Sequence, residues 1–164
     1  MTLPKQTFHR VYIKYVDDIL RFSYWLSGNK EDAKDLTSEA FVRLWTTPTL
    51  IEVETVKMYL ITIVRNLYIQ KKQKDKNNSS LVNDYQDTKE TIDVTIENKS
   101  EVSHIMHKLQ SLPEIDRTAL LLYANEGYSY QEIADYLKLS LSNIKIKISR
   151  VRKVLIEFKN GESV

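Results

Sequence analysis

The sequence has 164 residues, enough for one domain or two small ones, and its 42% apolar content is sufficient for a packed core. Only three glycines and three prolines argue against a β-sandwich, and the absence of cysteine excludes both a disulfide framework and a thiolate zinc site. The net charge of +2 hides an uneven distribution, because residues 138–159 carry seven bases and one acid whereas residues 75–101 carry seven acids and three lysines.

Apolar residues at helical spacing predict three helices in the first half of the chain. The first covers residues 8–26 and ends at the turn signal Ser27-Gly28-Asn29. The second covers residues 29–45, with acids in its first turn that suit the helix dipole, and residues 50–54 then form a short loop. The third runs from residue 55 to about residue 74. We expect these helices to form one compact bundle over residues 8–74.

The periodicity fades over residues 75–99, which are rich in Asn, Ser, Asp, Thr and Lys. Such a composition buries too little apolar area to offset the entropy of ordering. We therefore predict a flexible polar linker there. Its acids could act as a simple spacer or could occupy a basic channel in a partner, and the sequence leaves both readings open.

Helical spacing resumes near Ser100 and predicts a second, four-helix domain over residues 100–159. Pro113 suits the first position of a helix, and Glu114 and Asp116 place negative charge at its amino end. Gly127 suits a left-handed stop after that helix. The predicted fold class is thus all-α, with two small helical domains joined by a linker.

Residues 129–159 predict a helix-turn-helix. Ser129 and Glu132 have the spacing of a capping box, and Ser140 can cap the following helix. Small Ala134 allows the two helices to approach closely. The outward positions of the second helix are expected to be basic, at Lys145, Lys147, Arg150, Arg152 and Lys153. A helix with an apolar back and a basic front is suited to enter the major groove of DNA.

Two blocks of residues resemble the extracytoplasmic-function (ECF) group of bacterial RNA polymerase sigma factors. Residues 32–45, with Tyr59-Leu60 and Arg65-Asn66, resemble region two of that family. Residues 112–134, with Ile144-Lys145, resemble region four. The resemblance implies a promoter-specificity subunit whose partners are the RNA polymerase core and promoter DNA. Many family members are also held by an anti-sigma protein, although no residue here identifies one.

The resemblance implies contacts for the first domain. The second helix would bind the clamp helices of the polymerase's largest subunit through Asp35, Ser38, Glu39 and Phe41, where Ser38 replaces the family's usual Gln. The third helix would hold the melted promoter strand through Tyr59, Arg65, Asn66, Lys71 and Lys72. Tyr59 could stack on an unpaired base or belong to the core.

For the second domain, the resemblance implies that the last helix reads the upstream promoter element as a duplex. The candidate contacts are Ser142, Asn143, Lys145, Ile146, Lys147 and Arg150. Asn143 suits an adenine edge, the lysines suit guanine, and Ile146 suits a thymine methyl group. Lys138 departs from the family pattern, because it stands in the turn where glycine is usual and a left-handed conformation costs a side-chain residue roughly 1 kcal/mol.

Two other classes of protein compete with this interpretation. A stand-alone helix-turn-helix regulator would bind palindromic operator DNA as a dimer without polymerase. An inhibitor that binds polymerase but reads no promoter would tolerate changes at Lys145 and Lys147. The sequence has no phosphate loop, activated nucleophile or metal-ligand cluster, and the pair His104 and His107 is expected to be structural. We expect no catalysis, cofactor, metal or small-molecule substrate.

The sequence carries no sign of a membrane span or of export. The longest apolar run, residues 119–124, has six residues, whereas a helical span needs roughly 20. The first five residues contain no apolar core typical of a signal peptide. We therefore expect a cytoplasmic protein.

Overall fold

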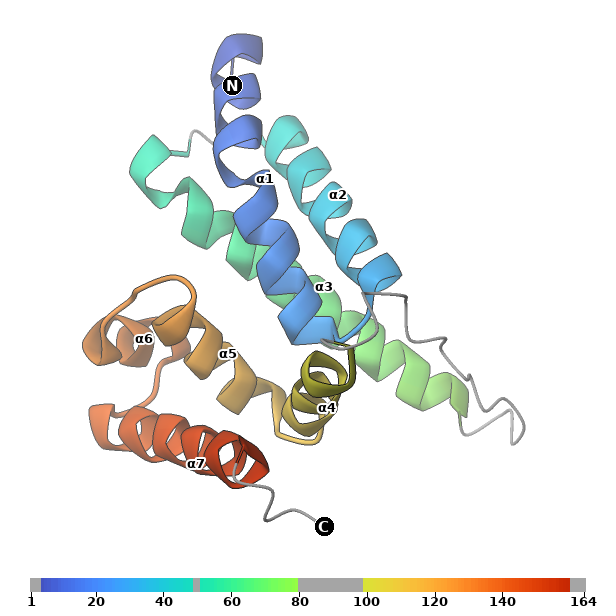
Figure 1. Cartoon of the computed structure of the whole chain (residues 1–164). Helices are drawn as coiled ribbons and strands as arrows, with labels where there is room; N and C mark the ends of the chain where they lie inside the picture. The colour runs from blue at the N-terminus through green and yellow to red at the C-terminus, as the bar shows by residue number, and fades with distance from the viewer. Residues whose placement is uncertain (1–3, 49–50, 80–98, 160–164) are drawn as a thin grey trace. The chain divides into compact units, whose positions relative to one another are not determined.

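In the computed structural model, residues 4–48, 51–79 and 99–159 are described, and every regular element within them is a helix (Figure 1). The chain forms two compact units, residues 1–90 and residues 91–164. The all-α fold class is confirmed, with helices α1 to α3 in the first unit and α4 to α7 in the second.

The first unit is an antiparallel pair of helices, α1 (Lys5–Ser27) and α2 (Lys30–Thr46), with α3 (Val56–Ser79) packed on both (Figure 1). Gly28 ends α1 in the left-handed conformation, with φ 73°, and donates its N–H to the carbonyl of Tyr24. Asn29 then caps α2 by accepting from the Asp32 N–H at 2.9 Å. This tight turn brings α2 back along α1.

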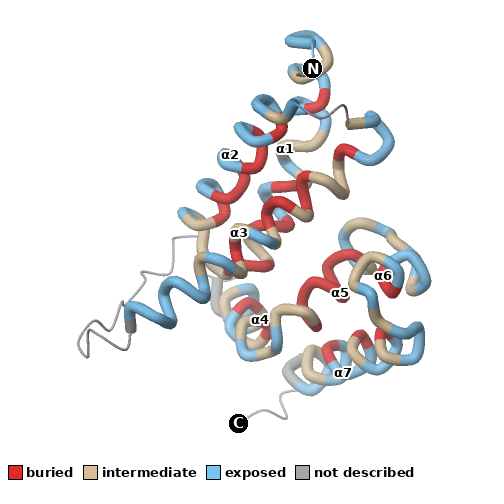
Figure 2. Tube along the Cα trace, turned by 180° about the vertical axis from the view of Figure 1, so that it is seen from behind, coloured by how far each residue is buried: buried red, intermediate tan, exposed pale blue. Residues whose placement is uncertain are grey.

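Apolar residues at helical spacing on the facing sides of the three helices form the core of the first unit (Figure 2). The fully buried residues are Ile19, Phe22, Leu26, Ala40, Leu44, Val56, Leu60, Ile61 and Val64. A short 3-10 helix, η1 (Val53–Thr55), leads into α3 within the segment predicted to be a loop.

Three buried hydroxyls, of Ser23, Ser27 and Thr37, lie where α1 packs on α2. Thr37 Oγ1 donates to the carbonyl of Ala33 at 2.7 Å and lies 3.3 Å from Ser23 Oγ. Ser27 Oγ donates to the carbonyl of Ser23 at 2.7 Å. Because the hydroxyls of Ser27 and Thr37 donate to carbonyls of their own helices, these small side chains are buried with their donors satisfied.

Helix α3 is longer than predicted, because it continues through residues 75–79, which the sequence assigned to the linker. The apolar periodicity does end near Tyr68, and residues 72–78 are all exposed. However, residues 56–79 include no proline or glycine to break the helix. Most of the remaining predicted linker, residues 80–98, lies outside the described residues.

The second unit consists of α4 (Lys99–Gln110), α5 (Glu114–Ala124), α6 (Tyr130–Leu137) and α7 (Leu141–Lys159). Helix α5 is central, since residues 116–122 are all buried and α5 contacts α4, α6 and α7 (Figure 2). Pro113 is extended, with φ −54° and ψ 145°, so it is the N-cap residue and Glu114 takes the first helical position predicted for Pro113.

The predicted helix-turn-helix is confirmed in its local geometry. The capping box is complete, with the Glu132 N–H and Ser129 Oγ 3.1 Å apart, and the Ser129 N–H and Glu132 Oε1 3.1 Å apart. Lys138 ends α6 in the left-handed conformation, with φ 58°, and Ser140 Oγ accepts from the Asn143 N–H at 3.1 Å. Ala134 is buried at the crossing, where its small side chain allows α6 and α7 to pack closely.

Candidate nucleic-acid and partner interfaces

The outer face of α2 presents three of the four residues expected to bind polymerase. Asp35, Ser38 and Glu39 are exposed, and Glu39 Oε1 accepts from Arg43 Nε at 3.1 Å. Phe41, the fourth residue, was expected on the same polymerase-binding face, and this expectation is wrong because Phe41 is not at the surface. Its side chain is 3% exposed and packs edge-on against Tyr12 at 5.0 Å between ring centroids, because it lies on the inner side of α2.

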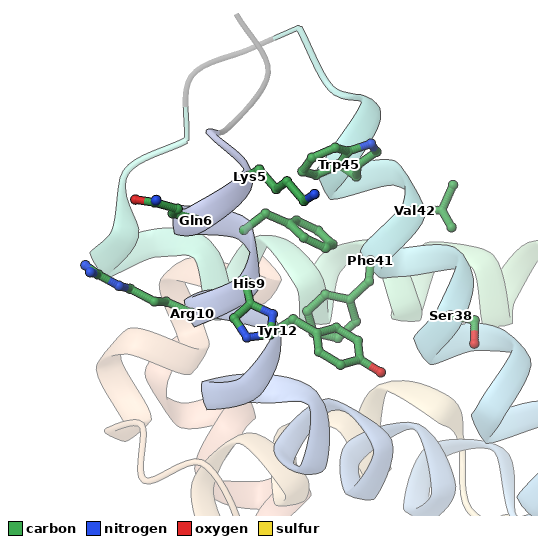
Figure 3. A pocket seen from close by; sticks show the side chains of 10 residues that line it. Lys5, Gln6, His9, Arg10, Tyr12, Ser38, Phe41, Val42 and Trp45 are labelled. Carbon is green, nitrogen blue, oxygen red and sulfur yellow. The ribbon is translucent and has the colours of Figure 1, made fainter.

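An apolar cleft of about 1090 Å³ lies beside this face, between the first turns of α1 and the end of α2 (Figure 3). Aromatic rings from both helices form it, and Phe8 packs against Trp45 with centroids 4.7 Å apart. Ser38 and Val42 also line the cleft, and Val42 is 54% exposed. The candidate polymerase face therefore continues into an apolar surface.

This cleft was not predicted from the sequence, although its signal is present there. Phe8 with Tyr12 and Phe41 with Trp45 are aromatic pairs four residues apart, so each pair lies on one face of its helix. Trp45 is 40% exposed although it is a large aromatic residue. The cleft depends on the antiparallel arrangement of α1 and α2 at this end, which local spacing does not reveal.

Four of the five residues expected to hold melted DNA lie on outward-facing parts of α3. Asn66 and Lys72 are exposed, whereas Tyr59 and Arg65 are half-buried. Tyr59 and Asn66 are seven residues apart, as are Arg65 and Lys72, so each pair shares a side of the helix. Lys72 Nζ lies 5.6 Å from the centroid of the Tyr68 ring.

Lys71 lies at the margin of this surface, with its side chain 41% exposed. It follows the buried Leu60 and Val64 at helical spacing, so it stands beside the packed side of α3. Its ammonium group forms an ion pair with Asp32 of α2, whose side chain is 18% exposed. This ion pair engages the Lys71 charge between two helices, and a contact of Lys71 with single-stranded DNA stays a prediction.

The outward face of α7 carries polar and basic residues around the apolar side chain of Ile146. Ser142, Lys145 and Ser149 are exposed, and Ile146 is 56% exposed. Arg150 and Lys153 border the same shallow surface, and Asn143 is half-buried at its side. The opposite face is fully buried through Ile144, Ile148 and Val151. Helix α7 thus has the apolar back and basic front that the sequence predicts.

Lys147 is the exception among the predicted duplex contacts. Its side chain is 17% exposed, and Nζ donates to Asp116 Oδ1 of α5 at 2.9 Å. Position 147 is three residues after Ile144 and four before Val151, at the edge of the buried face. Lys147 was predicted to point outward, and this prediction is wrong.

A second cation of α7 is held by aromatic rings. The guanidinium of Arg152 lies 5.0 Å from the centroid of the Tyr123 ring, which packs on Tyr130 with centroids 4.8 Å apart. A hydrogen bond with the Tyr123 side chain, followed by the electrostatic interaction with the Tyr130 side chain, raises the pKa of Arg152. This cluster ties α7 to α5 and α6.

Within the described ranges, no three His, Cys, Asp or Glu side chains gather into a possible metal site. In the same part of the chain, no helix has both the length and the apolar character that crossing a bilayer requires.

The two halves of the chain match two regions of one class of transcription protein. The family described as Sigma-70 region 2 matches residues 11–77, and the family described as Sigma-70, region 4 matches residues 104–155. Both regions, in this order, define a sigma-70-type factor.

Similar proteins indicate which group of sigma-70-type factors the chain resembles. SigE of Mycolicibacterium smegmatis is 29% identical over 154 residues, covering 88% of this chain and 58% of the length of SigE. SigM of Bacillus subtilis is 27% identical over 154 residues, covering 91% of this chain and 93% of SigM. Both are described as ECF RNA polymerase sigma factors. The chain belongs to the ECF group of bacterial RNA polymerase sigma factors.

A solved structure supports the fold. The sigma factor RpoE of Bartonella quintana, crystallised with the anti-sigma factor NepR, matches with a TM-score of 0.71 at 21% identity, covering 94% of this chain and 98% of RpoE.

Proposed function

We propose that this protein is a non-catalytic subunit that directs the RNA polymerase core to specific promoters and helps to melt them. The observation that carries the proposal is the basic outer face of α7 in a capped helix-turn-helix, present in a chain that also has a region 2 unit. The first unit would bind polymerase and the melted strand, and the second would read duplex DNA.

In this proposal, α2 binds the clamp helices of the polymerase's largest subunit. Asp35, Ser38 and Glu39 supply polar contacts, and Val42 extends the surface to the apolar cleft. Exposed charges on a helix can be contacted without disturbing its core, and an adjoining apolar surface supplies burial that a purely charged face lacks.

The exposed side of α3 would hold the unpaired strand. Arg65, Asn66 and Lys72 offer donors for phosphates, and half-buried Tyr59 offers a ring edge. Unstacking a base costs a few kcal/mol, which contacts with the extruded base offset, so opening by this route requires no nucleotide hydrolysis.

The second unit would place α7 in the major groove. Lys145 and Arg150 suit guanine or phosphate, Asn143 suits adenine, and Ile146 suits a thymine methyl group, with Ser142 beside them at the start of the helix. About half or more of such hydrogen bonds go to phosphates, which fix the position of the helix rather than read sequence.

The test is transcription in vitro with purified bacterial core polymerase and genomic fragments as templates. The protein should co-purify with core and direct initiation at discrete sites. Lys145→Glu should abolish those transcripts and leave core binding intact, whereas Lys14→Glu, a charge reversal on the exposed side of α1, should preserve both. A protein that never directs initiation with core is not a sigma factor.

DNA binding without polymerase, measured beside transcription, separates the competing hypotheses. A stand-alone regulator would bind a palindromic duplex tightly without polymerase, and a polymerase-binding inhibitor would be indifferent to Lys145→Glu. An anti-sigma protein is a further proposed partner, since RpoE of Bartonella quintana is described in complex with NepR. Co-purification from the source bacterium would identify it.

A further inference from the structure

A carboxylate is completely buried at the start of the central helix of the second unit. Asp116 is 0% exposed and occupies the third position of α5, where its N–H donates to the Pro113 carbonyl at 3.1 Å. The amino end of a helix favours a negative charge, but a buried carboxylate also needs a cation or hydrogen-bond donors. Its partners come from α7.

Two cations of α7 converge on Asp116 from positions three residues apart. Lys147 Nζ donates to Oδ1 at 2.9 Å, whereas the nearest nitrogen of Arg150, Nη1, lies 4.0 Å from Oδ2. The side chain of Lys147 is 17% exposed, and that of Arg150 is 60% exposed. Among the described residues, Oδ2 has no hydrogen-bond partner.

The geometry divides the roles of these two cations. Lys147 is fixed on the inner side of α7 by a direct hydrogen bond, so its charge is neutralised by Asp116 within the protein. Arg150 experiences the field of the same carboxylate, but its side chain is 60% exposed, so a phosphate can reach its guanidinium. Asp116 therefore pairs with Lys147 on the inner side of α7 and leaves Arg150 as the cation that is accessible to DNA.

We propose that Asp116 is a positioning residue for the DNA-reading helix. It holds Lys147 away from the DNA backbone and fixes the rotation of α7 on α5, so that Arg150 and the outer residues present one set of contacts. This inference depends on the proposed function, because it assumes that the outer face of α7 meets duplex DNA.

The test measures how the affinity of the full-length chain for DNA changes with salt. A labelled duplex of mixed sequence is titrated by fluorescence anisotropy over a series of KCl concentrations. The slope of log K against log[salt] changes by about 0.9 for each additional phosphate that the protein neutralises. The variant is Asp116→Asn, which keeps the shape of the side chain and removes its charge.

Asp116→Asn should release Lys147 to a phosphate and make the slope steeper by about 0.9. The matched control is Asp135→Asn, which removes an equal charge from an exposed site on α6, where Asp135 accepts from Gln131. The control should leave the slope unchanged. A purely structural role for Asp116 would lower thermal stability without steepening the slope.

A second comparison keeps the proposal open to refutation if Asp116→Asn fails to fold. Lys147→Gln retains a donor for Asp116 and should leave the slope unchanged, whereas Arg150→Gln should make it shallower by about 0.9. Equal losses from both variants would show that Lys147 contacts DNA directly and would overturn the proposal. Equal salt-dependence slopes for Asp116→Asn and Asp135→Asn would also overturn the proposal.

Failure of this inference is distinguishable from failure of the proposed function. If the protein directs promoter-dependent transcription but the slopes show no special role for Asp116, only the inference is wrong. If no duplex binding is seen at any salt concentration, both the inference and the proposed reading of duplex DNA are wrong.

Discussion

Lys138 in the helix-turn-helix turn provides a sharp test of the local backbone geometry. It adopts φ 58° and ψ 44°, the left-handed region, and it is the one residue other than glycine with positive φ in the described part of the chain. Its side chain is exposed. Replacing it with glycine should therefore remove backbone strain without removing a buried contact.

The magnitude follows from two opposing effects. A side-chain residue in the left-handed region costs roughly 1–2 kcal/mol, whereas glycine adds about 0.4–1 kcal/mol of conformational entropy to the unfolded chain. Lys138→Gly should thus stabilise the second unit by about 0.5–1 kcal/mol, which corresponds to a rise in Tm of roughly 2–8 °C for a domain of this size.

Thermal unfolding of the full-length chain checks this prediction. The only two tryptophans, Trp25 and Trp45, belong to the first unit. Tryptophan fluorescence therefore reports the first unit, and a circular dichroism transition without a fluorescence change reports the second. Lys138→Gly should shift only the latter transition upward.

Two controls complete the experiment. Lys138→Ala retains Cβ and its strain, so its Tm should stay close to that of the parent. Gly127→Ala should lower the Tm by a comparable amount, because Gly127 has φ 74° and a side chain there strains the backbone. An added Cβ would meet no atom within 4 Å, so no steric clash contributes to the change. If Lys138→Gly proves no more stable than Lys138→Ala, the strain argument is refuted.

Three further predictions concern the core, a cap and a surface. Phe22→Ala should destabilise the first unit by about 3–5 kcal/mol, since Phe22 is fully buried, and the tryptophan fluorescence transition should move to lower temperature. Ser129→Ala should cost about 1 kcal/mol through loss of the capping box, visible as a lower circular dichroism midpoint for the second unit with unchanged fluorescence. Asp35→Arg combined with Glu39→Arg should prevent co-purification with core polymerase while helicity stays constant, because both side chains are exposed; a loss of helicity would contradict their surface position.

Local features of the fold were predictable from the sequence because they depend on neighbouring residues. The Ser129 capping box and the Ser140 cap both consist of hydrogen bonds within a few residues, whereas the left-handed conformation of Lys138 was indicated by the glycine that the family usually has there. The apolar periodicity likewise indicated the buried faces, since spacing alone decides which residues share a side of a helix.

The ion pairs that two lysines form between helices were not predictable from the sequence. Lys71 and Lys147 are polar and stand at the margin of apolar stripes, where periodicity suggests solvent exposure. Their partners, Asp32 and Asp116, lie 39 and 31 residues away on other helices. A lysine stem is long enough to lie along apolar surface while its ammonium reaches such a carboxylate, and only the tertiary arrangement reveals the pair.

The exposed end of α3 gives this helix a gradient of local stability. Leu60 and Val64 are held by neighbouring helices, whereas residues 72–78 have no buried side chain. Helical segments shorter than about 12–15 residues are marginal in water without tertiary support. Amide protons near Val64 should therefore exchange with solvent only on unfolding of the first unit, while those after Gln73 should exchange through fraying of the helix end.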